Sequence, residues 1–492
     1  MSGSGHDPHS LQALKARYGE RHRWLLLLSV MLGTMASVMS STIMNVAIPD
    51  MSAHFALGQS RAQWVSSGFM VAMTVSMLTT PWLLMRYGYR RVYNLCMWGL
   101  LLGGLGGGFA TDYGLVLLAR VVEGLAAGVV QPIPAIIILR AFAPGEQGRA
   151  SGLFGTGVVL APAIGPSIGG VLVDAFGWRS IFFMVVPLAM LALWLSRRYV
   201  PTTAPGGVAA SSDARLDWTG LVLASAATLV LLNGLVQLHG EAAGMAALLL
   251  GLSALLALAF GIWQRRQLAR MAHGGRAPLM NLQVFASRSF AMGSLVSFTY
   301  GMALFGSTYL YPVFMQMGLG LSPSTIGAAL LPSGIALAVT INLVGRLADR
   351  QPAARLVNLG LALLALSFGL NFMVSPGAGL VWLWVWILVG RIGLGFILPS
   401  LNLGAMRGVP PGLIPQGSSI IGFIRMVGGA TGVSLCAIVL EWRLSVHGAR
   451  LGDVASEAAL RAFNETFASL ALLTALALVA AWHLGRPGQA RD

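Results

Sequence analysis

The chain has 492 residues, of which 56% are hydrophobic and only 10% are charged, and its mean hydropathy is +0.76. A water-soluble chain of this length could not hide so much apolar surface, so the composition predicts an integral membrane protein. The net charge of +15 would suggest nucleic-acid binding in a soluble protein. Here the basic residues lie in short segments between apolar runs, which indicates membrane topology and no nucleic-acid partner.

Apolar runs predict fourteen membrane-spanning helices, because a hydrocarbon core of about 30 Å needs about 20 apolar residues per helix. They begin near residues 24, 62, 91, 113, 148, 179, 216, 244, 289, 323, 354, 379, 416 and 465. The first run, Trp24 to Ile48, is longer than a signal-peptide core of about 7 to 15 residues, so we expect it to be a retained span. The predicted fold class is an all-α integral membrane protein.

The distribution of basic residues predicts the orientation of the chain. With the N-terminus inside, alternate loops hold most of the 31 Lys and Arg residues, and the opposite loops hold few. Loops rich in Lys and Arg stay in the cytoplasm, so both termini are expected to be cytoplasmic. Omitting one helix would invert every later loop and destroy this asymmetry, which supports the even number of spans.

An internal repeat divides the chain into two halves. A basic loop and an Arg-bearing helix occur first as Arg86-Tyr-Gly-Tyr-Arg90-Arg91 with Arg120, and again as Gly345-Arg-Leu-Ala-Asp349-Arg350 with Arg391. Repeated halves place a substrate path between them near the membrane midplane. The expected domains are a cytoplasmic tail (1–23), a six-helix half (24–196), a linker with two inserted helices (197–288), a second six-helix half (289–484) and a cytoplasmic tail (485–492).

A segment rich in small residues runs from Gly157 to Gly170 and contains Pro162, Gly165, Pro166, Gly169 and Gly170. Proline removes backbone hydrogen bonds and glycine lets another helix approach closely, so we expect a kinked and tightly packed helix. Ordinary packing of small residues is the alternative explanation. The segment resembles the antiporter motif of exporters with the major facilitator fold.

Further stretches resemble the fourteen-span drug:proton antiporters of the EmrB/QacA type. They are Ser41–Pro49, Gln63–Val65, Trp178–Phe182, Asp217–Gly220, Pro399–Asn402 and Arg425–Gly429. The resemblance implies proton-driven efflux of amphipathic or cationic organic compounds by alternating access, a role in antibiotic resistance, and location in a bacterial inner membrane. It also implies a periplasmic adaptor protein and an outer-membrane channel as partners. Gating is assigned by the resemblance to loop residues Arg86, Arg90, Gly345, Asp349 and Arg350.

Two positions depart from the family pattern. The family carries an Asp in its first helix where this chain has Ser40, and the first basic loop lacks the acid expected near Met85, whereas the second loop keeps Asp349. The missing helix-one Asp corresponds to the family's proton-binding or cation-binding carboxylate. The alternative function is therefore a passive facilitator, or an exporter of an anionic or lipid-like metabolite, with weakened or relocated proton coupling.

Glu123 is the one acid that falls well inside a predicted span. It lies three residues after Arg120, so both side chains project from the same helical face. A carboxylate in the bilayer costs several kcal/mol unless it is paired or faces a cavity. We therefore predict that Glu123, with Arg120, binds the coupled proton. A static ion pair that only allows Arg120 to be buried is the alternative.

Polar and aromatic residues within spans are the predicted contacts for a small-molecule substrate. They are Ser40, Asn45, Trp64, Gln131, Gln316, Asn402 and Arg425. Each could instead form a hydrogen bond between helices. A membrane enzyme would need paired carboxylates, a His cluster or an activated nucleophile, but the eight histidines are scattered and Cys96 and Cys436 lack metal-ligand spacing. No enzymatic activity, cofactor or metal is predicted.

Overall fold

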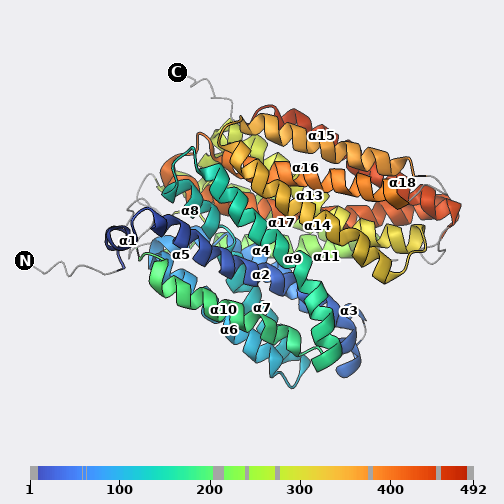
Figure 1. Ribbon diagram of the computed structural model, residues 1–492, viewed down its shortest axis with the longest axis horizontal. Helices are drawn as coiled ribbons and strands as arrows, with labels where there is room; N and C mark the ends of the chain where they lie inside the picture. The colour runs from blue at the N-terminus through green and yellow to red at the C-terminus, as the bar shows by residue number, and fades with distance from the viewer. Residues whose placement is uncertain are drawn as a thin grey trace, which may run out of the picture. The chain divides into compact units, whose positions relative to one another are not determined.

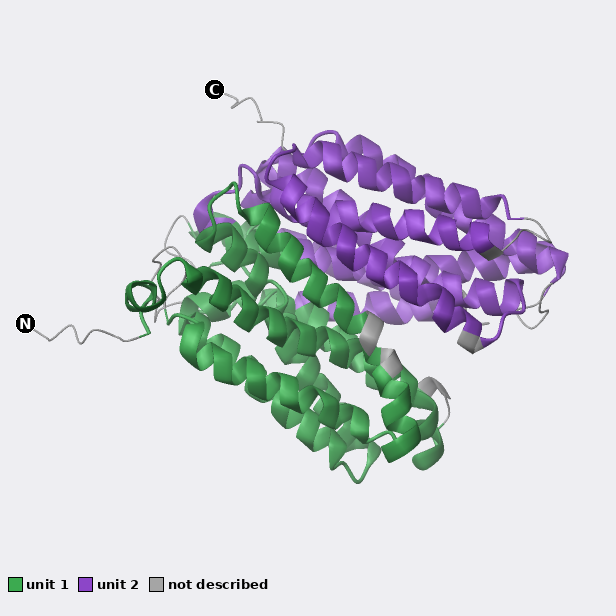
Figure 2. Cartoon of the chain, in the orientation of Figure 1, with its two compact units in different colours: residues 1–221, 264–281, 414–420 green, residues 222–263, 282–413, 421–492 purple. Residues whose placement is uncertain are grey.

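The computed structural model describes residues 9–57, 59–62, 64–202, 215–238, 243–271, 277–374, 380–449 and 456–484. Within these ranges the regular secondary structure is helical and includes no β-strand. The chain divides into two compact units, coloured separately in Figure 2. Unit 1 comprises residues 1–221, 264–281 and 414–420, and unit 2 comprises residues 222–263, 282–413 and 421–492.

Unit 1 is built from the first ten helices (Figure 1). They are α1 (Leu11–Tyr18), α2 (Arg21–His54), α3 (Gln59–Ala62), α4 (Trp64–Met77), α5 (Thr80–Tyr87), α6 (Tyr89–Gly108), α7 (Tyr113–Val130), α8 (Ile133–Ala141), α9 (Gln147–Phe176) and α10 (Ser180–Tyr199). Helix α7 packs against α4 and α6, α10 packs against α6 and α2, and α2 also packs against α9. Helices α4 and α5 are bent by 58° at a short break.

The remaining helices lie wholly or mainly in unit 2. They are α11 (Trp218–Gln237), α12 (Ala243–Met271), η1 (Leu282–Ala286), α13 (Arg288–Val313), the π-helical turn η2 (Phe314–Gly318), α14 (Pro323–Ala348), α15 (Ala353–Phe372), α16 (Leu380–Met406), η3 (Pro411–Leu413), α17 (Ile414–Val446) and α18 (Glu457–Ala481). Helix α16 packs against α14, α15 and α13, and α18 packs against α15 and α13.

The same helix pairings occur in both units. In unit 1, α7 packs between α4 and α6, and α10 joins α6 to α2; in unit 2, α16 packs between α14 and α15, and α18 joins α15 to α13. Arg120 in α7 and Arg391 in α16 thus occupy corresponding helices. The internal repeat that the basic loops indicate is present in the helix packing. The exact domain boundaries stay a prediction.

Among the described residues, eleven helices are long and apolar enough to cross a membrane, or twelve if the bent pair α4 and α5 is one span. Helices α6 and α9 are also long, with 20 and 30 residues. The all-helical fold is confirmed, while the number of fourteen spans stays a prediction. The last helix begins at Glu457, earlier than the predicted start near residue 465, because Ser456 caps it and charged residues such as Arg461 and Glu465 interrupt the apolar run in its first turns.

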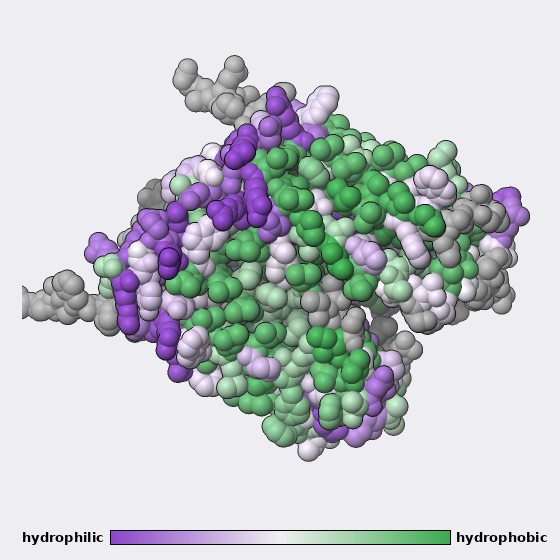
Figure 3. Space-filling view, viewed as in Figure 1, coloured by the Kyte–Doolittle hydropathy of each residue, from purple (hydrophilic) through white to green (hydrophobic). Residues whose placement is uncertain are grey.

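The surface has the pattern of a protein surrounded by lipid. Large apolar side chains lie exposed on the flanks of the helices: Leu95, Leu118 and Val171 are 69%, 59% and 68% exposed. Figure 3 shows hydrophobic side chains along the helices and hydrophilic ones gathered at helix ends, for example around α1. Lipid solvates such flanks, and the helical backbone satisfies its own polar groups there.

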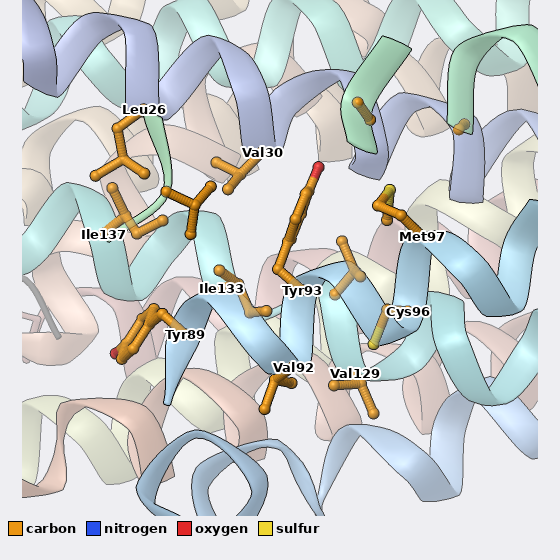
Figure 4. Packing of buried hydrophobic residues seen from close by; sticks show 14 of the residues in the cluster. Leu26, Val30, Tyr89, Val92, Tyr93, Cys96, Met97, Val129, Ile133 and Ile137 are labelled. Atoms are coloured by element: carbon orange, nitrogen blue, oxygen red, sulfur yellow. The ribbon is translucent and has the colours of Figure 1, made fainter. Parts of the chain in front are cut away.

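The core of unit 1 brings α2, α6, α7 and α8 together (Figure 4). Leu26 of α2 lies beside Ile137 of α8, Val30 of α2 lies near Tyr93 of α6, and all four are buried. The Tyr93 hydroxyl donates a hydrogen bond to the Ser29 carbonyl oxygen at 2.7 Å, so its one polar atom is satisfied. Cys96 and Cys436, one in each unit, are both buried free thiols.

A buried polar contact ties the start of α11 to the end of α12. The Asp217 carboxylate accepts hydrogen bonds from the Gly220 amide and from Gln264 Nε2, both at 2.9 Å, and Gln264 Oε1 accepts from the Met280 amide at 3.1 Å. Asp217 and Gln264 are 3% and 0% exposed. The stretch Asp217–Gly220, which resembles a family landmark, therefore has a structural role in joining the two inserted helices.

Candidate functional site

A buried charged cluster lies within unit 1, where α7 packs against α2 and α4. Arg120 and Glu123 are one turn apart on α7, and Ser40 comes from α2. Arg120 and Glu123 are both 0% exposed, and Ser40 is 1% exposed. The predicted spacing of Arg120 and Glu123 on one helical face therefore leads to a direct contact between them.

The three side chains form a closed set of hydrogen bonds. Arg120 Nη1 donates to Glu123 Oε2 at 2.6 Å and to Ser40 Oγ at 2.7 Å. The Ser40 hydroxyl in turn donates to Glu123 Oε2 at 3.1 Å. Ser40, at the position where the resemblance leads us to expect an acid, thus contacts both members of the ion pair. The carboxylate of the cluster comes from α7 instead of α2.

Helix α4 holds the guanidinium group of Arg120 from another side. Arg120 Nε donates to the Val65 carbonyl oxygen at 3.2 Å, and the guanidinium carbon lies 4.1 Å from the centroid of the Phe69 ring. A desolvated cation over an aromatic face gains about 2 kcal/mol. The sequence does not predict that Val65 and Phe69 contact Arg120, because nothing in the local sequence of α4 indicates a partner on α7.

Two glycines of α6 provide the space for Glu123. A Cβ atom at Gly103 would lie 2.5 Å from Glu123 Cγ, and one at Gly104 would lie 2.9 Å from the Phe182 carbonyl oxygen and 3.7 Å from Glu123 Oε1. Glycine is therefore required at both positions by close approach. The glycine-rich run at the end of α6 is the signal in the sequence that could have indicated this contact.

Two polar atoms of the cluster have no hydrogen-bond partner among the described residues. They are Glu123 Oε1 and Arg120 Nη2, and both are buried. Leaving a buried polar atom unpaired costs about 1–3 kcal/mol, and more when the group is charged. The second carboxylate oxygen is thus available for a proton, and the second guanidinium nitrogen is available for another acceptor.

The segment that resembles the antiporter motif lies in α9, which is one continuous helix. Its glycines meet α2: a Cβ at Gly165 would lie 3.3 Å from Met39 Cγ, and one at Gly169 would lie 2.5 Å from Ile43 Cγ1. A Cβ at Gly170 would meet nothing within 4 Å. Pro162 is half-buried, and the side chain of Pro166 lies outside the described residues. The close approach therefore involves the helix that carries Ser40.

The first predicted gating loop connects α5 to α6. Arg90 donates to the Arg197 carbonyl oxygen at 2.6 Å, at the end of α10, and Arg86 is half-buried. Between them, Gly88 has φ +78°, and a Cβ there would lie 2.6 Å from the Thr202 carbonyl oxygen. This backbone conformation and this approach both require glycine. The loop is thus held against the end of α10.

The second predicted gating loop follows α14. Gly345 is buried within the helix, Asp349 is the residue directly after its last turn, and Arg350 is exposed. The gating role of both loops stays a prediction.

The predicted substrate residues are divided between the two units. Ser40, Asn45, Trp64 and Gln131 belong to unit 1, and Gln316, Asn402 and Arg425 belong to unit 2. Asn45 Oδ1 accepts a hydrogen bond from the Ser66 hydroxyl at 2.9 Å, which is the contact between helices that we named as the alternative. Trp64 is 43% exposed, Gln316 is exposed, and Gln131, Asn402 and Arg425 are half-buried. Gln63 lies outside the described residues.

Two units with repeated helix pairings and an ion pair buried within a span are typical of membrane transport proteins. The fold and the site together define a polytopic membrane transporter.

Comparison with known proteins identifies the family. Residues 30–433 match the Major Facilitator Superfamily, and the chain belongs to that family. It is therefore a transporter of small molecules and not an enzyme.

Two of the similar proteins are named for multidrug resistance or multidrug export. The chain is 29% identical to the multidrug resistance protein B homolog of Mycobacterium tuberculosis, over 84% of this chain and 75% of the relative. It is 27% identical to the multidrug export protein EmrB of Escherichia coli K12, over 87% of this chain and 82% of the relative. These matches confirm the resemblance to exporters of the EmrB type.

A solved structure shares the fold. The crystal structure of the human organic anion transporter MFSD10 superposes with a TM-score of 0.66 at 16% identity and covers 94% of this chain and 99% of that one. At this identity the likeness concerns the fold alone.

Proposed function

We propose that this protein exports amphipathic organic compounds across a bacterial inner membrane in exchange for protons. The observation that carries the proposal is the fully buried cluster of Ser40, Arg120 and Glu123 within unit 1. A proton-coupled cycle needs an ionisable group inside the membrane whose surroundings change as access alternates. Glu123 is such a group, and its second oxygen has no hydrogen-bond partner among the described residues.

Protonation of Glu123 would change the contacts of three helices at once. The neutral carboxyl group loses the charge that holds Arg120 at 2.6 Å, and Arg120 also contacts Ser40 on α2 and Val65 on α4. Loss of the ion pair therefore alters the relative stability of two arrangements of α2, α4 and α7. Since a ligand shifts a conformational equilibrium only through its different affinity for the two states, proton binding can drive the cycle.

The similar proteins support the proposed substrate class, and the charge distribution supports the proposed topology. Relatives named for multidrug resistance and multidrug export support export of amphipathic organic compounds. Arg120 already neutralises Glu123, so this carboxylate is not free to receive a cationic substrate. The excess of basic residues in alternate loops supports cytoplasmic termini. A periplasmic adaptor protein and an outer-membrane channel are the proposed partners in a Gram-negative cell.

The test is transport of a fluorescent amphipathic compound into proteoliposomes with an imposed pH gradient. We expect Glu123→Gln to abolish gradient-driven accumulation but to keep exchange of labelled for unlabelled substrate, which needs no net proton movement. The control is Glu457→Gln, which removes an acid that is 66% exposed and, within the described part of the chain, forms an ion pair with Arg461 at 2.5 Å. Equal gradient-driven accumulation by wild type and Glu123→Gln would remove Glu123 from the mechanism. A wild type that never accumulates substrate against its gradient would indicate a passive facilitator.

A further inference from the structure

Helix α12 turns one side outward along its length. Among the described residues it is the least buried of the helices that could cross a membrane, with 11% of its most apolar stretch inside the protein. Its inner side is fixed by hydrogen bonds. Ser253 Oγ donates to the Ala227 carbonyl oxygen on α11 at 3.0 Å, and Gln264 Nε2 donates to Asp217 Oδ2 at 2.9 Å. Ser253 and Gln264 are about three turns apart and lie on the same side, so the opposite side of α12 faces outward.

The outward side of α12 is an apolar stripe that ends in arginines. Residues spaced by three, four or seven positions share one face of a helix. On α12 an exposed series with this spacing consists of Leu248, Leu252, Leu255, Ile262, Arg266 and Arg270. Leu248 and Leu255 are 63% and 65% exposed, and Ile262 is 45% exposed. From Leu252 to Ile262 the helix rises about 15 Å, which is half of a hydrocarbon core of about 30 Å. The stripe therefore matches the length of acyl chains in one leaflet.

The start of α11 lies beside the basic end of α12, because Asp217 and Gln264 are joined by a hydrogen bond. Two exposed residues precede and open α11 at this level, Arg215 and Trp218. The Trp218 side chain is 65% exposed. Tryptophan favours the head-group layer of a bilayer, so this end of the helix pair has the composition of a membrane interface.

The basic end of α12 carries an excess of positive charge. The sequence contains no Asp or Glu between Glu241 and Asp349, and the carboxylate of Asp217 is buried within hydrogen bonds. Within the described part of the chain, Arg265 and Arg266 form no ion pair. Arginines in this loop would suffice to set the topology of the chain. Topology does not require that they continue an exposed apolar stripe, whereas binding of an anionic amphiphile does.

We propose that the outward side of α12 binds an anionic phospholipid. The acyl chains lie along Leu252, Leu255 and Ile262, and Arg266 and Arg270 hold the phosphate of the head group. A guanidinium group presents paired N–H donors that match phosphate oxygens, and the apolar stem of an arginine can extend along lipid while its charge stays at the interface. The inserted helix pair is thus a lipid-recognition element. This inference does not depend on the proposed proton coupling or on the exported compound.

The test is lipid binding to the purified full-length protein in detergent, measured by native mass spectrometry. The two probes are dioleoylphosphatidylglycerol and dioleoylphosphatidylcholine, which share their acyl chains and differ in net charge. One arginine near an anionic head group contributes about fivefold to affinity. We expect wild type to bind the first phosphatidylglycerol at least about tenfold more tightly than phosphatidylcholine. The double variant Arg266→Gln with Arg270→Gln should lose about 5- to 25-fold in affinity for phosphatidylglycerol and change by less than about twofold for phosphatidylcholine.

Matched variants separate this site from general charge effects. Arg266→Lys with Arg270→Lys keeps both positive charges and should recover most of the affinity for phosphatidylglycerol. The control is Arg407→Gln with Arg461→Gln, which also removes two exposed arginines. Among the described residues, the helical turns next to Arg407 and Arg461 carry no large exposed apolar side chain. This control should change the affinity for phosphatidylglycerol by less than about twofold. Free glycerol 1-phosphate, which lacks acyl chains, should not displace the bound lipid.

Three results would overturn the lipid site. The first is equal affinity of wild type for the two lipids. The second is an equal loss of affinity for phosphatidylglycerol in the α12 variant and in the control, which would mean that the lipid responds only to the net charge of the protein. The third is displacement of the lipid by glycerol 1-phosphate, which would indicate a site for soluble phosphates.

Discussion

The ion pair of Arg120 and Glu123 can be tested by replacing each residue with methionine, singly and together. At a separation of 2.6 Å the attraction between the two charges is about 6 kcal/mol for an effective dielectric constant of about 20. Each single variant leaves one buried charge without its partner and should lower the free energy of unfolding by about 3–5 kcal/mol. The double variant leaves no charge and should come within about 2 kcal/mol of wild type, because apolar replacement of a buried pair is often neutral.

The measurement is equilibrium unfolding in mixed micelles of detergent and SDS, followed by circular dichroism. The thermodynamic cycle should give an interaction energy of at least about 3 kcal/mol. A value below about 1 kcal/mol, typical of exposed pairs, would refute the reasoning that both groups are desolvated.

The same double variant also separates structure from mechanism. It should fold and still exchange substrate, but it should not accumulate substrate in response to a pH gradient. Accumulation at the wild-type rate would mean that the ion pair is static and only allows Arg120 to be buried.

Three smaller changes test the surroundings of the cluster and the first loop. Ser40→Ala removes the hydroxyl that donates to Glu123 and accepts from Arg120. It should lower the free energy of unfolding by about 1–3 kcal/mol in the same assay. An unchanged free energy of unfolding would mean that Ser40 is not part of the network. Gly103→Ala places a Cβ 2.5 Å from Glu123 Cγ and should lower the free energy of unfolding by about 1–3 kcal/mol. The control is Gly106→Ala, where a Cβ meets nothing within 4 Å. It should leave the free energy of unfolding unchanged or raise it by up to about 1 kcal/mol. Gly88→Ala should lower the melting temperature, because φ is +78° and the Cβ would lie 2.6 Å from the Thr202 carbonyl oxygen. A melting temperature equal to that of wild type would show that the loop adjusts without strain.

The helices and their pairing could be predicted because they depend on local composition and on a repeated pattern. A span needs a continuous apolar run, so helix starts such as Tyr113 and Ala353 lie within about two residues of the predicted positions. The contact between Arg120 and Glu123 follows from helical spacing alone. Where polar residues open a helix, as at Glu457, the apolar run begins later than the helix, and the predicted start was wrong by about two turns.

The rest of the site depends on contacts between helices, which the sequence does not contain locally. Val65 contributes a backbone carbonyl oxygen, and any residue has one, so its role as an acceptor for Arg120 could not be predicted. Asn45 is predicted to contact substrate because it is polar within a span. Its Oδ1 accepts a hydrogen bond from Ser66, a contact that the sequence does not indicate, and its role toward substrate stays a prediction.

The two cysteines have a consequence for spectroscopy. Cys96 and Cys436 are 6% and 1% exposed, so thiol reagents should react slowly with both in the folded protein. The natural sequence therefore serves as an almost unreactive background for site-directed labelling. A pair of cysteines introduced at exposed positions, one in each unit, could carry spin labels or fluorophores without first removing the native thiols. Distances between such labels, recorded with and without substrate or at different pH, would follow the transport cycle in an otherwise unaltered protein.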